Sequence, residues 1–157
     1  MRKKEKPKPT PQYVHPKHQG KNGKKKMSFD LHGVLDANSD FFRMVLQDLI
    51  RQGWEIHIVT GGRWAQERST LKKLRIPYTH FFSIVDYHLT IGTKIKWDEK
   101  GNAHIDPYVW DRTKGLYCRE HGIIMHFDDS DSYGYFFKTP YVRYFSKDSS
   151  RDKKVHI

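Results

Sequence analysis

Short apolar segments recur along the chain and predict buried strands. The segments MSFDLHGVL, WEIHIVT and IIMHF are rich in β-branched or aromatic residues, and each is followed by polar or glycine positions. They predict strands that end near Asp30, at Thr60 and just before Asp128. A further segment, YVRYF, predicts a last strand close to the end of the body of the chain.

Between these strands the apolar positions take helical spacing. SDFFRMVLQDLIR carries apolar residues three and four positions apart and is followed by Gly53, which predicts a helix that stops there. RWAQERSTLKKLR predicts a second, more polar helix ended by Pro77, and DPYVWDRTKGLYCREH a third ended by Gly122. SYGYFF predicts a short helix. Within residues 80–106 the pattern predicts only a hairpin, KIKWDEKGNAHID.

This alternation predicts an α/β fold of the Rossmann-like kind, a parallel sheet with helices on both faces and a small hairpin insert. In such sheets ligands bind beyond the carboxyl ends of the strands. Asp30, Thr60 and the pair Asp128–Asp129 all fall at predicted strand ends. We therefore expect these side chains to meet at one edge of the sheet.

The charge of the chain is concentrated at its ends. The 157 residues carry a net charge of +11, of which residues 1–26 hold ten basic side chains and one acid. Residues 151–157 are also basic, so the body, residues 27–150, is electrically balanced. Residues 1–26 combine lysine, proline and glycine with few apolar groups, which predicts a disordered arm. Its candidate polyanion-binding residues are Lys3, Lys4, Lys6, Lys8, Lys24, Lys25 and Lys26.

Several classes of protein fit the composition poorly. Cys118 is the single cysteine, so no intrachain disulfide can form. No segment approaches the roughly 20 apolar residues of a membrane span, and the basic N-terminus lacks the apolar core of a signal peptide. We expect a cytoplasmic protein without a membrane partner.

The basic arm, residues 1–26, has two possible roles. It could bind nucleic acid, or it could be a solvated tail that aids solubility.

The polar strand ends match the needs of phosphoryl transfer to a carboxylate. That reaction needs a nucleophile, a divalent cation held by carboxylates, and groups that orient the phosphate. Asp30 can serve as nucleophile and ligand, and Asp129 as a second ligand. Thr60 offers a hydroxyl and Lys114 a cation. Each residue alone also suits an ordinary structural role, so the argument depends on the set.

The chain resembles the haloacid dehalogenase superfamily of phosphatases and phosphotransferases in four motifs. FDLHGVL matches the first, a strand followed by Asp-x-Asp-Gly, except that His32 replaces the second aspartate. IHIVTGG matches the second, a strand ending in Ser or Thr, here Thr60. TKGLYCREHGI matches the third, a lysine at the start of a helix, and IIMHFDDSD the fourth, a strand followed by paired acids. The motifs keep the family's order between about Met27 and Phe145.

The resemblance implies a magnesium-dependent phosphatase that forms an aspartyl-phosphate on Asp30. It implies Mg²⁺ as cofactor, a backbone carbonyl from position 32 as one ligand, and proton transfer by the side chain there. The implied site comprises the catalytic residues Asp30, His32, Thr60 and Lys114, the metal-binding residues Asp30, His32, Asp128 and Asp129, and the phosphate- or substrate-binding residues Gly61, Gly62 and Arg63.

His32 is the departure from the family pattern. A histidine has an ordinary pKa of about 6.5 and can shuttle protons near neutral pH, so it can take over the acid–base role. The substitution also keeps a second hypothesis open, a catalytically weak protein of this fold that binds nucleic acid or a nucleoprotein assembly through its basic arm. Phosphotransfer to an acceptor other than water is a third.

The segments between the motifs leave room for little or no cap domain. The hairpin around residues 100–102 is the one candidate insert between Thr60 and Lys114. Family members with an open site tend to accept large substrates. Together with the basic arm, this favours a nucleotide, a nucleic-acid phosphate end or a phosphoprotein as the phosphorylated substrate.

Overall fold

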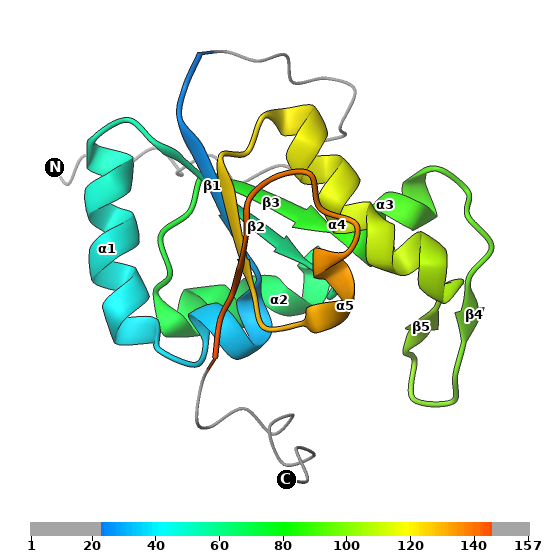
Figure 1. The fold of residues 1–157 in the computed structure, drawn as a ribbon. Coiled ribbons are helices and arrows are strands. Elements are labelled where there is room, and N and C mark those ends of the chain that lie inside the picture. Colours follow the sequence, from blue (N-terminus) through cyan, green and yellow to red (C-terminus); the bar gives the residue numbers. More distant parts are fainter. Residues whose placement is uncertain (1–22, 146–157) are drawn as a thin grey trace, which may run out of the picture.

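The computed structural model describes residues 23–145, which form one α/β unit around a parallel sheet (Figure 1). The sheet has five strands, all paired in parallel, in the order β3-β2-β1-β6-β7. The predicted Rossmann-like architecture is thus confirmed. The strands are β1 (Lys26–Phe29), β2 (Glu55–Thr60), β3 (His80–Ser83), β6 (Met125–Asp128) and β7 (Tyr141–Arg143).

The strand order creates a switch point beside β1. The chain first builds outward from β1 through β2 to β3, then returns to the other side of β1 to place β6 and β7. Connections on either side of such a point diverge and leave a crevice at the carboxyl ends of the two central strands. Asp30 follows β1 and Asp128 ends β6, so the two acids flank this crevice.

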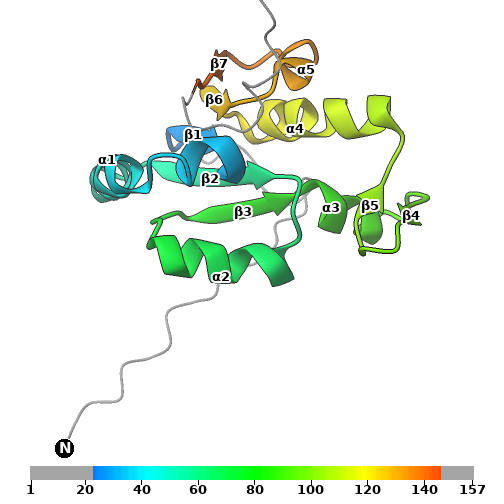
Figure 2. The same cartoon turned by 90° about the horizontal axis from the view of Figure 1, so that it is seen from below.

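Helices cover both faces of the sheet, as predicted (Figure 2). On one face, α1 (Ser39–Arg51) and α2 (Trp64–Leu74) bury Phe42, Leu46 and Leu71 against the sheet. On the other, α3 (Ile84–Thr90) and α4 (Pro107–His121) contribute Ile84, Tyr117 and Cys118 to a second core. Cys118 is a free, buried thiol. The short helix α5 (Asp131–Gly134) packs against α4 and β7.

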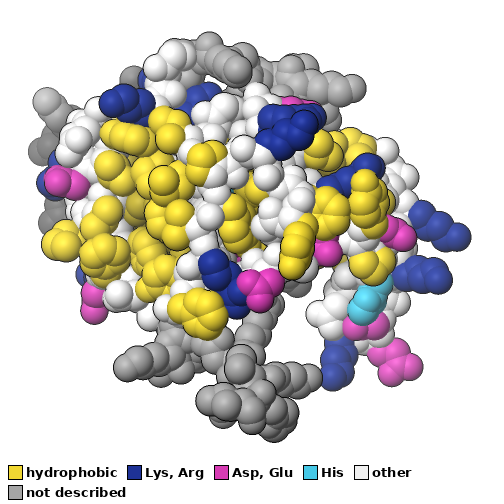
Figure 3. Space-filling model, in the orientation of Figure 1, with side chains coloured by type: hydrophobic (Ala, Val, Ile, Leu, Met, Phe, Trp, Pro, Cys, Tyr) yellow, Lys and Arg dark blue, Asp and Glu magenta, His cyan; other side chains and the backbone are white. Residues whose placement is uncertain are grey.

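The hairpin predicted around Lys100 is present as β4 (Lys96–Trp97) and β5 (Ala103–His104), and it projects from the body between α3 and α4 (Figure 1). Asp98 orders its turn by accepting hydrogen bonds from the backbone N–H groups of Lys100 and Asn102. Its surface carries basic, acidic and histidine side chains, at the lower right of Figure 3. The hairpin is therefore a preformed polar projection.

No strand or helix was predicted for residues 80–90, which form β3 and α3. The strand is only four residues long, HFFS, and such a short segment shows no periodicity. Pairing of Phe81 and Phe82 with Ile58 and Val59 of β2 supplies what the local sequence lacks.

The boundary of the arm was also predicted wrongly at Lys26. This residue is the first of β1 and pairs in register with Glu55 at the start of β2. Its side chain is 2% exposed, and its Nζ lies 3.7 Å from Glu55 Oε2. Lys26 therefore balances a buried carboxylate instead of facing a polyanion. Lys24 and Lys25 are exposed, whereas Lys3, Lys4, Lys6, Lys8, the rest of residues 1–22 and residues 146–157 lie outside the described part of the chain.

Within residues 23–145, no helix combines the length and the apolar character needed to cross a bilayer.

Helix α2 ends at Leu74, three residues before Pro77, and the residue that caps it is in the left-handed conformation. Arg75 has φ 55° and ψ 36°, and its N–H donates to the carbonyls of Leu71 and Lys72. A side chain in this region meets its own backbone, which a glycine avoids. The end of α2 is therefore set by this cap rather than by the proline.

We expect Arg75→Gly to raise the free energy of unfolding by about 0.5–1 kcal/mol, since relief of the left-handed strain exceeds the added entropy of the unfolded chain. Urea unfolding measures the change. Gln52→Gly is the matched control, because Gln52 also caps an exposed helix end but has φ −80°. It should destabilise the protein, and equal effects at both positions would contradict the explanation.

Candidate functional site

The carboxyl ends of three strands bring the predicted polar residues to one edge of the sheet. Asp30 follows β1, Thr60 ends β2 and Asp128 ends β6. The backbone N–H of Asp30 donates to the Phe127 carbonyl at 2.8 Å, which continues the pairing of β1 with β6 beyond the strand. The predicted proximity of these residues is a direct consequence of the parallel register.

Lys114 joins the two central acids. Its Nζ lies 3.2 Å from Asp30 Oδ1 and donates to Asp128 Oδ2 at 2.7 Å, and its side chain is 1% exposed. The helix predicted over DPYVWDRTKGLYCREH is confirmed, because α4 begins at Pro107 and is capped by Asp106. Lys114 therefore lies two turns into the helix, and not at the helix start that the family motif implies. The lysine reaches the site because the middle of α4 crosses the carboxyl edge of the sheet.

Burial and the ion pairs shift the three pKa values in different directions. Burial raises the pKa of Asp30 to about 6, with Lys114 acting in the opposite sense. Burial also opposes ionisation of Asp128 and Lys114. Lys114 and His126 outweigh burial at Asp128 and lower its pKa, and the attraction of Asp30 and Asp128 outweighs burial at Lys114 and raises its pKa. The lysine is therefore charged at neutral pH. Its Nζ lies closer to Asp128 Oδ2, at 2.7 Å, than to Asp30 Oδ1, at 3.2 Å.

Asp128 is fully occupied by protein donors. Besides Lys114, its carboxylate accepts from His126 Nε2 at 3.1 Å and from the Ser130 N–H at 3.1 Å. The Ser28 hydroxyl holds His126 Nδ1 from the other side at 2.7 Å. This network fixes Asp128 as the residue that positions Lys114. Asp129, at 8% exposed, is the more accessible of the predicted pair.

Asp30, Asp128 and Asp129 each have a carboxylate oxygen within 4.8 Å of the others, so the predicted acidic metal-binding group is assembled. A wide single turn, η2 (Leu31–Leu35), closes over it, with Asp36 N–H bonded to the Leu31 carbonyl. Gly33 in this turn has φ +82°, and a Cβ there would lie 2.2 Å from Asp129 Oδ2. Only glycine permits this approach.

His32 is held between two carboxylates from different elements. Its Nδ1–H donates to Asp36 Oδ2 and its Nε2–H to Glu67 Oε1, both at 2.9 Å. The hydrogen bond to Asp36 raises the pKa of His32 to about 9, with a smaller contribution from Glu67. The ring is therefore an imidazolium at pH 7, rather than a group that titrates close to its ordinary pKa.

Most of the predicted residues open into one cavity of about 310 Å³. The hairpin lines it through Trp97 and Lys100, and α4 and α5 line it through Trp110 and Tyr133. Asp128 and Asp129 do not line it. The predicted residues that do line it are Asp30, His32, Thr60, Gly61, Gly62, Arg63 and Lys114.

The two glycines after β2 allow close packing around the cavity. A Cβ on Gly61 would lie 2.7 Å from the Trp110 ring, and one on Gly62 would lie 2.1 Å from Glu67 Oε1. Arg63 is tied to the body, because its Nε donates to Asp86 Oδ1 at 3.0 Å. Its guanidinium thus has a fixed position at the cavity rim.

Sequence reasoning missed the aromatic wall of the cavity. Tyr133 lies with its ring 4.4 Å from Lys114 Nζ, and its hydroxyl accepts from Trp110 Nε1 at 2.8 Å. Glu67, the partner of His32, was missed as well. No local pattern identifies these three residues, since each reaches the site only through the packing of α2, α4 and α5.

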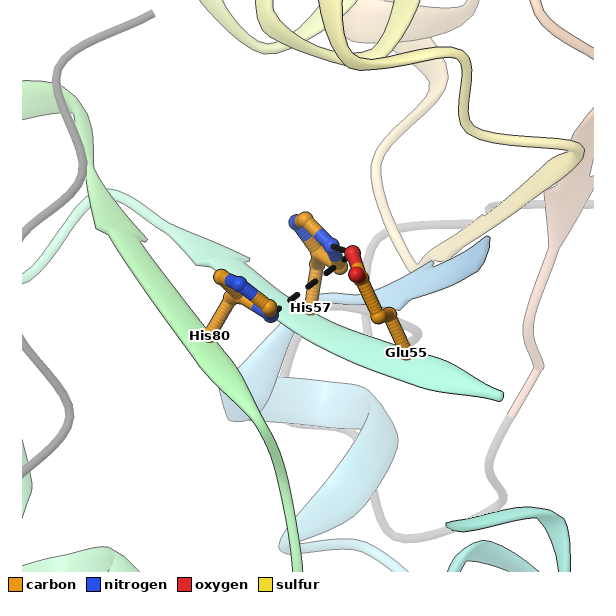
Figure 4. A group of neighbouring side chains, drawn as sticks. All are labelled: Glu55, His57 and His80. Atoms are coloured by element: carbon orange, nitrogen blue, oxygen red, sulfur yellow. Dashed lines mark hydrogen bonds and ion pairs between the residues drawn. The ribbon is translucent and has the colours of Figure 1, made fainter. Parts of the chain in front are cut away.

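A second polar group, also missed, lies at the opposite end of the sheet (Figure 4). Glu55 and His57 stand at the amino end of β2, and His80 begins β3. These three residues also place one potential ligand atom each within 4.8 Å of the others. The alternation of WEIHIVT predicts one polar face, but all six residues of β2 are buried. The buried polar residues therefore form an internal cluster.

Comparisons with known protein families, with curated proteins and with solved structures find no match to this chain.

Near this second group lies His121, at the end of α4. Its side chain is buried, and neither ring nitrogen has a hydrogen-bond partner among the described residues. Burial lowers the pKa of His121 to about 4. Between about pH 6.5 and pH 4 the unfolded chain therefore binds a proton here that the folded chain does not.

We expect the free energy of unfolding to fall as the pH drops through this window, with His121 contributing at most about 1.4 kcal/mol per pH unit. In His121→Gln the loss between pH 7 and pH 5 should be smaller than in the wild type. Urea unfolding at both values gives the comparison. His104→Gln, at an exposed position, should lose as much stability as the wild type, and an equal loss in His121→Gln would disprove the assignment.

Proposed function

We propose that the protein is a magnesium-dependent phosphatase of the haloacid dehalogenase type that forms an aspartyl-phosphate on Asp30. The observation that carries the proposal is the buried set of Asp30, Lys114 and Asp128 at the switch point of the sheet, open to a cavity on the Asp30 side. A carboxylate beside a fixed cation at the mouth of a cavity suits covalent phosphoryl transfer.

The acidic group fits Mg²⁺. Asp30 and Asp129 offer carboxylate oxygens from neighbouring strand ends, and His32 offers its backbone carbonyl. Gly33 packs against Asp129, which holds the turn that carries His32 beside the acidic group. When bound, Mg²⁺ would neutralise phosphate oxygens and help to orient them for attack. Asp128 would act through Lys114, because its own oxygens are already engaged.

The remaining residues bind and orient the phosphate. The Thr60 hydroxyl and the backbone amides of Gly61 and Gly62 line the cavity beside Asp30 and suit phosphate oxygens. Lys114 neutralises charge on the nucleophile and on the phosphoryl group. Asp30 then attacks phosphorus as the bond to the leaving oxygen breaks.

His32 supplies the proton. As an imidazolium it can give its Nε2 proton to the leaving oxygen, after which the neutral ring accepts a proton from the attacking water. Attack by water at phosphorus breaks the bond to Asp30 and releases inorganic phosphate. Glu67 and Asp36 keep the ring in place and favour its charged form.

For the substrate we propose nucleotides or nucleic-acid phosphate ends. The hairpin wall offers an aromatic ring, Trp97, 47% exposed, and a cation, Lys100, at the cavity. Bases stack on aromatic rings, and phosphodiesters favour nearby cations. No large domain closes over this side in the described part of the chain, which leaves room for a polymer.

A catalytically weak binding protein is the second candidate. It is favoured by the engagement of both His32 ring nitrogens with carboxylates, which makes release of a proton costly. In that case the same cavity and the basic arm would bind nucleic acid without turnover.

We expect Asp30→Asn to abolish magnesium-dependent hydrolysis of an activated phosphate ester, because an amide neither attacks phosphorus nor binds the cation strongly. Steady-state rates with Mg²⁺ give the comparison across nucleotides, end-phosphorylated oligonucleotides and sugar phosphates. The control is Asp48→Asn, which changes an exposed acid of α1. Equal rates in the wild type and Asp30→Asn would refute the site.

His32→Asn should keep the backbone carbonyl but lower turnover about 100-fold, the usual scale of general acid–base assistance. The wild-type rate should fall as the pH rises through about 9, where the imidazolium loses its proton. His32→Asp should recover part of the rate and should shift the pH at which the rate falls. Rates from pH 6 to pH 10 decide between the candidates. An inert wild type beside an active His32→Asp variant would establish the binding protein instead.

A further inference from the structure

The cluster at the amino end of the sheet has the composition of a transition-metal site. Glu55 Oε2 lies 3.1 Å from His57 Nε2 and 3.9 Å from His80 Nδ1. Two imidazoles and a carboxylate are a common ligand set for Zn²⁺. In Figure 4 the three side chains converge on one point above β2 and β3. The cluster lies at the other end of the sheet from Asp30, so it is independent of the proposed phosphatase.

We propose that Glu55, His57 and His80 bind a transition-metal ion of the Zn²⁺ class. Ligand bonds of about 2.0–2.1 Å in a tetrahedron separate ligand atoms by about 3.3–3.4 Å. The two separations from Glu55, 3.1 and 3.9 Å, bracket this value, and all three ligand atoms lie within 4.8 Å of one another, so inward movement of the side chains would complete the set. Mg²⁺ prefers an all-oxygen set and would not compete here.

The surroundings orient the ligands. The Tyr117 hydroxyl lies 2.7 Å from His57 Nδ1 and leaves Nε2 directed at Glu55. Such partners on the far ring nitrogen fix the orientation of metal-binding histidines. The rings of His57 and His80 are stacked at 4.3 Å, so one ring must turn for both lone pairs to face a single ion. Burial lowers the pKa of both histidines, so both are neutral at pH 7. Neutral imidazole is the form that binds metals.

A further imidazole is available beside the cluster. The His121 ring lies 5.9 Å from that of His57, is 1% exposed, and has two nitrogens without a hydrogen-bond partner among the described residues. A buried imidazole in this state costs free energy unless something satisfies it. Rotation toward the ion, or a water bound between them, would do so. His121 and Lys26 also line a cavity of about 350 Å³ beside the cluster.

Lys26 is the competing cation. Its Nζ lies 3.7 Å from Glu55 Oε2, is buried, and has no hydrogen-bond partner among the described residues. A divalent ion on Glu55 would be repelled by this ammonium. The proposal therefore makes opposite predictions for the two kinds of variant. Loss of a ligand should weaken binding, and loss of the Lys26 charge should strengthen it.

The test is a zinc titration of the metal-stripped full chain in excess Mg²⁺, which occupies the carboxylate group at Asp30. Competition with a chromophoric chelator gives stoichiometry and affinity. We expect one tight equivalent of Zn²⁺, at least 10- to 100-fold weaker in His80→Gln and at least 10-fold tighter in Lys26→Met. His104→Gln and the double variant His15→Gln/His18→Gln, which change histidines outside the cluster, should bind as the wild type does.

Circular dichroism establishes that each variant is folded, and thermal unfolding gives a second reading. Zn²⁺ should raise the melting temperature of the wild type but not of His80→Gln, which keeps the test decisive if Lys26→Met does not fold. Absence of a tight equivalent would overturn the proposal. So would equal affinity in the wild type and His80→Gln, or loss of binding only in the His15→Gln/His18→Gln variant.

Discussion

The ion pairs of Lys114 with Asp30 and Asp128 are the interaction on which the arrangement of the site depends. A buried ammonium is costly unless it is paired, and here its two partners come from the two central strands of the sheet. Those strands lie on either side of the switch point, so the lysine ties α4 to both. Without it, two buried carboxylates would repel each other. The same charge that stabilises the edge of the sheet would neutralise a phosphate bound there.

The sheet separates two polar groups by the length of its strands. At the carboxyl edge, acids surround a lysine, and Asp30 and Lys114 line a cavity that the hairpin also lines. At the amino edge, Glu55 lies among histidines and is balanced by Lys26. The oxygen-rich group suits a hard cation, whereas the imidazole-rich group suits a softer one. The two ions that we propose would therefore differ in class and would not compete for the same group.

The protonation state of His32 is set by its neighbours. In isolation a histidine after the nucleophile suggests a group poised near neutral pH. Between Asp36 and Glu67 it becomes a fixed imidazolium, with a pKa raised by the first of these hydrogen bonds. This keeps a proton on the ring at pH 7, and the ring can accept a proton from water only after it has given that proton to a leaving group. The two carboxylates thus set the order of the proton transfers in the proposed reaction.

The sequence by itself determined the parallel α/β architecture, the hairpin and the meeting of Asp30, Thr60 and Asp128 at one edge. Periodicity gives strands and helices, and parallel pairing then brings the strand ends together. Only the tertiary structure decided what depends on packing between distant segments. It created β3 through pairing with β2, drew Lys26 into the sheet, and placed Trp110, Tyr133 and Glu67 around the cavity. The protonation of His32 and the cluster at Glu55 belong to this second kind, because a pKa and a ligand set depend on neighbours that no local pattern specifies.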